Sequence, residues 1–249
     1  TSSMIGLIMD HFGFSTPVYL REPQLPAGPD NVAQINEIVS EIHTHRPLQY
    51  ILGYTRFCDL TIKIDGNVLI PRPETEEMVC RIRGKLKGAP ARILDLGTGS
   101  GCIALALKKC LTDAEVHALD LSEDALDLAR SNALEQQEEI VFHQGDICNP
   151  GSAWPAYDLL VSNPPYVPVR ELETMAPHVR NSEPHIALFA SDGDPLEFYR
   201  CICHFAAQFL KVEGQLFVEI HKDFGAQVVA LFWEFGFRDI VLKKDIFGR

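Results

Sequence analysis

No stretch of the sequence approaches the ~18 to 20 uninterrupted apolar residues that a helix needs to cross a bilayer, so no membrane-spanning helix is expected. The first residues, TSSMIGLIMD, have no basic segment and no long apolar core, which argues against a secretory signal. Because the chain begins with Thr1 and not with Met, the question of an upstream targeting segment stays open. Basic residues are also scarce: 22 Lys and Arg stand against 34 Asp and Glu, and the net charge of −12 disfavours tight, non-specific binding to a nucleic-acid backbone.

The sequence has seven cysteines but no CxxC pair, so it lacks a usual spacing of zinc ligands. Cys201 and Cys203 fall in a predicted helix, where side chains two residues apart point to different faces. This pair therefore suits neither a zinc site nor a disulfide. We expect free, buried thiols, no metal, and a reducing compartment, either the cytosol or an organelle matrix.

A length of 249 residues with 46% hydrophobic residues allows one catalytic domain plus a small appendage. Residues 17–29 are rich in proline and glycine and predict a loop, and Asp30 then caps a helix. The segment 56–64 alternates like a strand, and Asp65-Gly66 marks a turn. We interpret residues 1–70 as a helical and β-hairpin appendage.

From residue 71 onward, strand patterns alternate with helix patterns, which is typical of a doubly wound, mostly parallel sheet with helices on both faces. The fold class expected is therefore α/β. The predicted helices cover about 75–86, 100–110, a segment capped by Ser122, Pro195–Lys211 and about 223–235. The predicted strands are 91–96, 115–120, 139–143, 157–162, 215–220 and 237–243.

The segment DLGTGSG, from Asp95 to Gly101, lies directly between a predicted strand and a predicted helix, where a doubly wound sheet binds nucleotide-like ligands. Its glycines give GxGxG and not the GxxG end of a dinucleotide fingerprint, and no GK[ST] follows to make a P-loop. Tight packing of strand against helix alone would also explain such glycines. Two further aspartates favour a ligand site: Asp120 at the end of the next strand suits ribose hydroxyls, and Asp146 with Ile147 suits adenine.

The fourth predicted strand ends in Asn163-Pro164-Pro165-Tyr166. The two prolines fix the backbone and lack N–H groups, so the carbonyl of Pro164 is free to accept a hydrogen bond. Together with the Asn163 side chain it can grip a planar –NH2 group, on which Tyr166 can stack. A glutamine amide and the exocyclic amine of adenine or cytosine both fit this grip, and a rigid turn without chemistry is the plainer alternative.

These segments resemble the HemK-type protein-(glutamine-N5) methyltransferases, which modify peptide chain release factors. The resemblance rests on IPRPETE at 70–76, DLGTGSG and SNPPYV, with RPLQYILG before them and Glu183-Pro184 and Ala187-Leu188 after them. It runs from about residue 46 to the C-terminus. It implies the class I methyltransferase fold, which is Rossmann-like, and S-adenosyl-L-methionine as the cofactor.

The resemblance also implies roles for particular residues. The glutamine of the Gly-Gly-Gln loop of a release factor would enter the pocket of Asn163, Pro164, Pro165 and Tyr166, and the N-terminal appendage would contact the release factor. Arg72 and Glu74 lie in a loop that would fold over the donor side of the site, as direct participants or as an ion pair that orders the loop. The residues implied to bind the cofactor are Gly97, Thr98, Gly99, Ser100, Gly101, Asp120, Asp146, Ile147 and Asn163.

The chain departs from the family pattern in four ways. The appendage is shorter than usual, which leaves truncation open, and Ile147 stands where an aromatic residue is common. His221 follows Glu219-Ile220 where the family tends to have glycine, and we expect it to be solvated. The sequence ends at Arg249 where the family continues into one more strand, so we expect an unpaired sheet edge or another element in that place.

Two alternatives to glutamine methylation belong to other classes. An amino-methyltransferase acting on DNA would need a flipped base and a basic surface, which the net charge disfavours. A non-catalytic partner subunit would keep the fold but not the chemistry, which the intact DLGTGSG and NPPY segments argue against. We expect a monomer that binds no nucleic acid directly, located in the mitochondrion if eukaryotic and otherwise in the cytoplasm.

Overall fold

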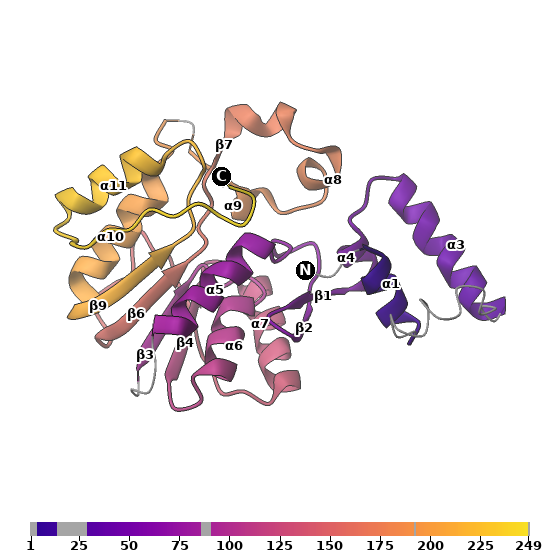
Figure 1. Cartoon of the computed structure of the whole chain (residues 1–249), viewed down its shortest axis with the longest axis horizontal. Helices are drawn as coiled ribbons and strands as arrows, with labels where there is room; N and C mark the ends of the chain where they lie inside the picture. The colour runs from indigo at the N-terminus through magenta and orange to yellow at the C-terminus, as the bar shows by residue number, and fades with distance from the viewer. Residues whose placement is uncertain (1–3, 14–28, 86–90, 192, 249) are drawn as a thin grey trace.

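The computed structural model describes residues 4–13, 29–85, 91–191 and 193–248. Its centre is a sheet of five parallel strands in the order β5-β4-β3-β6-β9 (Figure 1). The strands are β3 Arg92–Leu96, β4 Glu115–Asp120, β5 Val141–Gln144, β6 Tyr157–Ser162 and β9 Leu210–Val218. The α/β class and the parallel sheet predicted from the sequence are confirmed.

Helices cover both faces of this sheet because the strands carry apolar side chains on both sides. Ile93 of β3 faces a core that it shares with α5 Pro73–Lys85, α6 Cys102–Cys110 and α7 Glu123–Gln136. Leu94 and Leu96 face the opposite core, where α10 Glu197–Phe209 packs. Helix α11 Gly225–Glu234 then packs on α10 (Figure 1).

A series of short elements lies between β6 and α10. The chain forms strand β7 Val167–Pro168, a 3₁₀ turn η1 Val169–Thr174, helices α8 Pro177–Arg180 and α9 His185–Leu188, and strand β8 Phe189–Ala190. Strands β7 and β8 pair with each other and not with the main sheet. We call residues 167–190 the excursion between β6 and α10. It lies beyond the end of β6 at one edge of the molecule (Figure 1).

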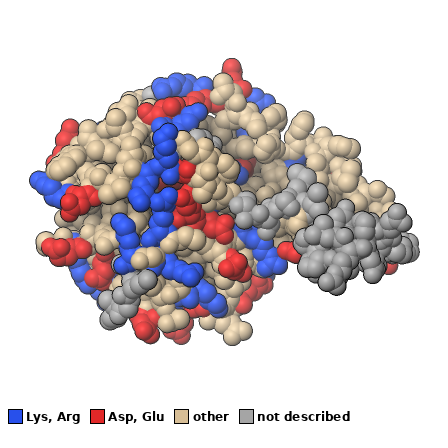
Figure 2. All heavy atoms as spheres, in the orientation of Figure 1, with Lys and Arg blue, Asp and Glu red and all other residues tan. Residues whose placement is uncertain are grey.

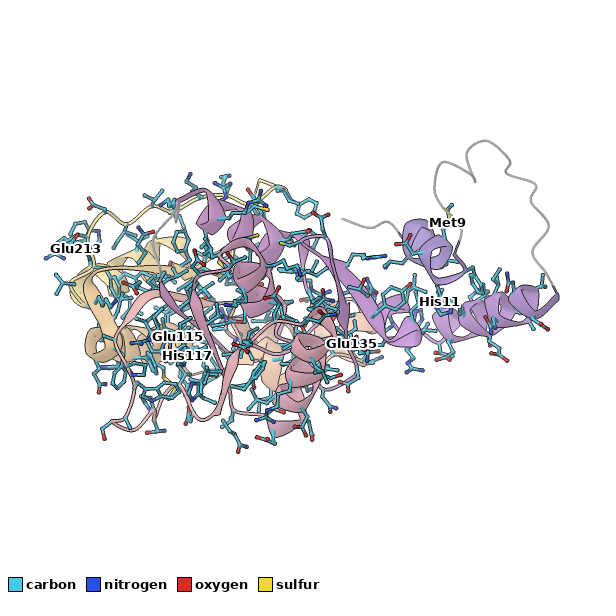
Figure 3. All side chains as sticks on the ribbon, turned by 90° about the horizontal axis from the view of Figure 1, so that it is seen from below. Met9, His11, Glu115, His117, Glu135 and Glu213 are labelled. Atoms are coloured by element: carbon cyan, nitrogen blue, oxygen red, sulfur yellow. A yellow bond between two sulfur atoms is a disulfide. The ribbon has the colours of Figure 1, made fainter. Side chains whose placement is uncertain are left out.

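The N-terminal helices extend away from the sheet, as Figure 3 shows for Met9 and His11 on α1 Met4–His11. Helix α1 packs with α3 Pro29–His43 and α4 Leu48–Leu52 around a small core of Leu7, Ile38 and Leu48. The loop expected over 17–29 lies, apart from its last residue, outside the described residues. Within the described part of the chain, every helix is too short or too polar to span a bilayer.

A hairpin of β1 Tyr54–Phe57 and β2 Leu60–Lys63 joins these helices to the main body. Ile62 is fully buried in the core under the sheet, and Lys63 pairs with Glu135 of α7, which Figure 3 labels. The buried Asn132 of α7 accepts from the Lys63 N–H (2.8 Å) and donates to the Lys63 carbonyl (3.0 Å) and the Ser100 carbonyl (2.9 Å). One side chain therefore links the hairpin to the glycine loop.

The single strand predicted over 56–64 is wrong, because the chain reverses within it. Cys58 and Asp59 both have positive φ, 47° and 64°, and form a two-residue turn between antiparallel strands. Such turns usually contain Gly or Asn, so the sequence carried little signal for one here. The Cys58 N–H donates to the Glu76 side chain of α5 at 2.6 Å, which stabilises the turn from outside.

The strand predicted over 237–243 is also wrong. An extended segment needs a neighbouring strand for its backbone hydrogen bonds, and β9 pairs only with β6 among the described residues. Val241 and Leu242 are instead 64% and 55% exposed. Strand β9 itself ends at Val218, two residues earlier than predicted, so Glu219 and His221 follow the sheet.

The expectation of free, buried thiols fails at one pair of cysteines, and it fails in part at Cys80 and Cys110, which are free but exposed. Cys148, after β5, and Cys201, on α10, form a disulfide with a Cα–Cα distance of 4.7 Å. The two are 53 residues apart in sequence, and only the packing of α10 beneath the sheet brings them together. Cys201 and Cys203 do not pair with each other, as predicted, and the free thiols are Cys58, Cys80, Cys102, Cys110 and Cys203.

Replacing Asn132 by leucine tests the link between hairpin and body. Asn132→Leu leaves backbone groups of Lys63 and Ser100 buried without partners, so the free energy of unfolding should fall by about 2 to 4 kcal/mol. Urea unfolding followed by circular dichroism measures it. Leu134→Ala, two residues away and 80% exposed, is the control and should change stability by less than about 0.5 kcal/mol. Equal stabilities would contradict the link.

Candidate active site

The carboxyl ends of the central strands lie at one level. In the sheet register, Leu96 of β3 stands opposite Leu119 of β4 on one side and Ser162 of β6 on the other. The Ser162 hydroxyl also donates to the Leu96 carbonyl at 2.7 Å. The glycine loop, Asp120 and the NPPY segment therefore leave the sheet side by side, as the sequence predicts for parallel strands.

The glycine loop is held by β4. The N–H groups of Gly97 and Thr98 both donate to the Leu119 carbonyl, at 2.8 and 3.0 Å. Gly97, Gly99 and Gly101 all have positive φ, which favours glycine. A Cβ on Gly101 would lie 3.1 Å from the Cβ of Ala129, whereas a Cβ on Gly97 or Gly99 would meet nothing within 4 Å. Packing therefore explains Gly101, while the space beside the other two is open.

Asp120 closes this loop from the end of β4. Its carboxylate accepts from the Gly99 N–H at 2.8 Å and from the Ser122 N–H at 3.0 Å. Burial raises its pKa above the usual range of aspartate, and the N–H donors oppose that shift. Each carboxylate oxygen keeps a lone pair for a further donor. Ser122 in turn caps α7 by accepting from the Ala125 N–H, as predicted.

Asp95, at the start of the glycine loop, is completely buried. One of its oxygens accepts from the Thr98 hydroxyl at 2.7 Å and the Ala104 N–H at 3.2 Å. The other oxygen has no partner within the described part of the chain. Burial raises the pKa of Asp95 to about 7, so the carboxylate is held only partly ionised at neutral pH.

The loop after β5 carries the residues predicted to meet adenine. The Asp146 carboxylate accepts from the Cys148 N–H at 2.8 Å and the Asn149 amide at 2.9 Å, so it orders its own loop. Ile147 is half-buried against the core that includes Leu94 and Leu119. The Gly145 N–H donates to the Asp120 carbonyl at 2.9 Å, which holds this loop against β4.

The NPPY segment is tied to two residues that the sequence analysis did not select. The Asn163 amide donates to the Thr75 hydroxyl of α5 at 3.1 Å. The Thr75 hydroxyl donates to Glu219 Oε2 at 2.6 Å, and the Tyr166 hydroxyl donates to Glu219 Oε1 at 2.8 Å. Between Asn163 and Tyr166 in the sequence, Pro164 is buried and Pro165 is half-buried. The sequence did carry one signal that could have identified Glu219. It lies at the end of a predicted parallel strand, as Asp95, Asp120 and Asp146 do.

Arg72 forms an ion pair, but its partner is Glu183 and not Glu74. The distance from the guanidinium to Glu183 Oε1 is 2.5 Å, and the Glu183 side chain is completely buried. This pair connects the IPRPETE loop to the excursion between β6 and α10. Tyr50 lies beside it and donates to the Val68 carbonyl at 2.6 Å. Glu74 begins α5 near Glu219, whose pKa it helps to raise.

The prediction that His221 is solvated is wrong, since it is only 6% exposed. The start of α11 folds over it: the Phe224 ring packs on the imidazole, and the Asp223 N–H donates to Nδ1 at 3.2 Å. Its backbone N–H donates to the Tyr199 hydroxyl of α10. The Glu171 carboxylate lies 3.4 Å from Nε2.

Glu171, His221 and Asp223 form the one group of metal-ligand type found among the described residues, with ligand atoms within 4.8 Å of one another. The Asp223 N–H occupies the lone pair of Nδ1, so a neutral imidazole carries its hydrogen on Nε2, facing Glu171. Each ring nitrogen of His221 would therefore have to give up its hydrogen bond before it could bind a metal ion. The group is better described as a hydrogen-bonded cluster.

Two other polar features lie away from these strand ends. A surface hollow lined by Glu115, Arg130 and Glu138 is at the amino-terminal ends of β4 and β5. His117 lies between His143 (2.8 Å) and Glu115 (3.0 Å) at the same end of the sheet, and Figure 3 labels His117 and Glu115. Since β4 separates both from Asp120, neither belongs to the site.

Comparison with known proteins identifies the family. The chain is 41% identical to the release factor glutamine methyltransferase of Bacteroides thetaiotaomicron over 87% of this chain and 78% of that protein. The chain belongs to the release factor glutamine methyltransferases. The relatives of that name from Flavobacterium psychrophilum (40%, over 91% and 81%) and Streptococcus pneumoniae (43%, over 80% and 70%) are similar. As a member, it is an S-adenosylmethionine-dependent methyltransferase.

Domain and structure comparisons agree with this family. The model of the methyltransferase small domain matches residues 82–181. The fold is similar to that of ribosomal protein L11 methylase from Lactobacillus delbrueckii subsp. bulgaricus, with a TM-score of 0.53 at 19% identity over 73% of this chain and 79% of that one. A methyltransferase from Pyrococcus furiosus gives 0.52 at 17% identity over 74% and 83%.

The residues at the strand ends fit the cofactor of this family. The open space beside Gly97 and Gly99 admits a ligand close to the backbone. Asp120 retains lone pairs for hydroxyl donors, and the buried, unpartnered oxygen of Asp95 favours positive charge nearby. S-adenosylmethionine carries a ribose, an ammonium and a sulfonium, so these accepting carboxylates suit the ligand.

The raised pKa of Asp95 predicts a particular dependence of stability on pH. The folded state favours the protonated form, so this contribution is fully present below the ordinary aspartate pKa of 3.8 and is lost progressively as pH rises to about 7. From about pH 5.5 to 7.5, the wild type should lose about 2 kcal/mol more unfolding free energy than Asp95→Asn. Urea titrations at both pH values measure the difference. Parallel profiles of the two proteins would show that Asp95 titrates normally.

Proposed function

We propose that this chain transfers a methyl group from S-adenosylmethionine to the side-chain amide nitrogen of the glutamine in the Gly-Gly-Gln loop of a peptide chain release factor. The observation that carries the proposal is the pairing of Leu96 with Ser162, which sets the glycine loop and Asn163 side by side at adjacent strand ends. The names of the relatives supply the substrate class.

In this proposal the residues that would hold the cofactor follow β3, β4 and β5. The backbone of Gly97, Thr98, Gly99, Ser100 and Gly101 would approach it, Asp120 would accept from its ribose hydroxyls, and Asp146 and Ile147 would contact adenine. Bound S-adenosylmethionine supplies an electrophilic methyl group on a good leaving group. The protein therefore needs no strong base, and its task is to align the nucleophile and exclude water.

The substrate amide is gripped by the NPPY segment. Asn163 and the carbonyl of Pro164 accept the two hydrogens of the –NH2 group, while Pro165 fixes the turn and Tyr166 stacks on the planar amide. As the nitrogen gains a methyl group, positive charge develops on it, and these acceptors stabilise that charge. The bond from the methyl carbon to the sulfur of the cofactor would break in the same step and leave a neutral thioether. The nitrogen would then release one proton to solvent, so that a neutral N-methyl amide remains.

We assign residues 1–70 to recognition of the release factor and 71–249 to the methyltransferase domain. Supporting this division, α1, α3 and α4 have their own small core and extend from the main body. Val32 and Val39 of α3 are 45% and 41% exposed and offer apolar contacts to a partner. The pair of Arg72 and Glu183 connects the loop that follows this division to the excursion between β6 and α10.

The alternative of DNA methylation has less support. Figure 2 shows a band of Lys and Arg side chains across one face, but acidic side chains border it, and the net charge is −12. We propose a monomer that binds no nucleic acid directly and works in the cytoplasm, or in the mitochondrion of a eukaryote. A partner subunit without catalysis would bind no S-adenosylmethionine, so a cofactor-binding assay separates it.

Transfer of labelled methyl groups to a purified release factor tests the function. Label should appear on the wild-type factor and be absent from a factor with Gln→Ala in its Gly-Gly-Gln loop. Asn163→Ala in the enzyme should lower the rate on the order of 10²- to 10³-fold, because an acceptor for the developing charge is lost. Cofactor binding should be weakened far less than the rate, because the glycine loop and Asp120 remain, and the exposed Asn67→Ala is the matched control.

Cofactor binding without labelling of the release factor would contradict the proposed substrate. Duplex DNA and other proteins, assayed in the same way, would then be the next acceptors to compare.

A further inference from the structure

Three side chains from separate elements form one hydrogen-bonded chain behind the NPPY segment. Asn163 follows β6, Thr75 lies in the first turn of α5, and Glu219 follows β9. The amide nitrogen of Asn163 is 3.1 Å from Thr75 Oγ1, which is 2.6 Å from Glu219 Oε2. Thr75 is only 2% exposed, so water does not replace these contacts.

The hydrogens in this chain can be assigned from chemistry. An ionised carboxylate only accepts, so Glu219 takes the hydroxyl hydrogens of both Thr75 and Tyr166. Thr75 has a single hydroxyl hydrogen, and once it is donated the oxygen can only accept. The group that faces Thr75 must then be the –NH2 of Asn163. Because the amide is planar, its oxygen points away from Thr75.

We propose that Glu219 and Thr75 are positioning residues that lock the amide of Asn163 with its oxygen toward the substrate. This inference rests on the proposed function, since it is the glutamine –NH2 group that requires an acceptor. A reversed Asn163 would present its own –NH2 to that group, and two sets of hydrogens would face each other. The lock excludes the reversed amide before substrate arrives, so no reorganisation is needed.

Protonation of Glu219 would release the lock. A neutral carboxyl can donate to Thr75, which can then donate to the oxygen of Asn163 and turn the amide around. The groups around Glu219 are Thr75 and Glu74 of α5, Arg72 before it, Tyr166 after β6 and Tyr199 of α10. Burial raises the pKa of Glu219, and Thr75 and Tyr166 oppose this. Turnover should therefore fall as pH decreases through this raised pKa.

Substitution of Thr75 and Glu219 tests the lock. Thr75→Val removes the hydroxyl and should lower kcat on the order of 10- to 100-fold, less than loss of Asn163 itself, with KM for S-adenosylmethionine unchanged. Thr75→Ser keeps the hydroxyl and should restore kcat to within about threefold of the wild type. Glu219→Gln keeps the shape of the side chain, but its amide has one accepting oxygen where the carboxylate has two. This variant should therefore lower kcat and flatten the acidic limb of the pH profile.

Two matched controls lie away from the site. Thr112→Val changes an exposed threonine between α6 and β4. Glu213→Gln changes an exposed glutamate in β9, which Figure 3 shows at the end of the molecule opposite Met9 and His11. Both should retain wild-type kcat and its pH profile. A loss of activity in these variants equal to that in Thr75→Val would overturn the proposal, because the loss would then be structural.

A second measurement does not depend on the substrate. The side-chain amide hydrogens of ¹⁵N-labelled Asn163 should exchange with solvent several-fold faster in Thr75→Val than in the wild type or Thr75→Ser. Unchanged exchange, or wild-type kcat in Thr75→Val, would overturn the lock. If the wild type labels no release factor while exchange responds as expected, the proposed substrate fails and the lock on Asn163 stands.

Discussion

Strand β3 lies between β4 and β6, and its backbone hydrogen bonds to both neighbours hold the ends of the three strands at one level. The glycine loop depends on this pairing directly, since its N–H groups donate to the carbonyl of Leu119, the last residue but one of β4. Asn163 depends on it too, because the Ser162 hydroxyl bonds to β3 one residue earlier. A shift of one residue in either register would separate the proposed cofactor and substrate sites.

Acidic side chains gather at these strand ends in surroundings that disfavour charge. Burial raises the pKa of Asp95, Asp120 and Glu219 alike. Asp120 and Glu219 offset this by accepting two hydrogen bonds each from neighbouring segments. The bonds from Gly99 to Asp120 and from Thr75 and Tyr166 to Glu219 connect segments that are distant in sequence, so these carboxylates organise the site as well as giving it negative charge. Asp95 differs, because one of its oxygens has no partner among the described residues.

The sequence was sufficient where one local pattern decides the structure. The apolar strands, the Ser122 cap and the glycine loop each follow from neighbouring residues, and the parallel topology brings their ends together. It was insufficient where the outcome depends on distant partners: the Cys148–Cys201 disulfide, the burial of His221 and the hydrogen bonds of Glu219 all arise from the packing of α10, α11 and α5. The segment 237–243 has strand-forming residues but no neighbouring strand among those described.

The contacts of Asn132 bear on any attempt to retarget the enzyme by exchanging its N-terminal part. A grafted appendage would have to end in a strand whose backbone offers one N–H and one carbonyl where Lys63 now does. Asn132 also donates to the Ser100 carbonyl, so a graft that displaces Asn132 would disturb the glycine loop. Chimeras joined ahead of Tyr54 would keep the native hairpin and avoid this problem, whereas those joined after residue 63 would have to reproduce the whole hairpin.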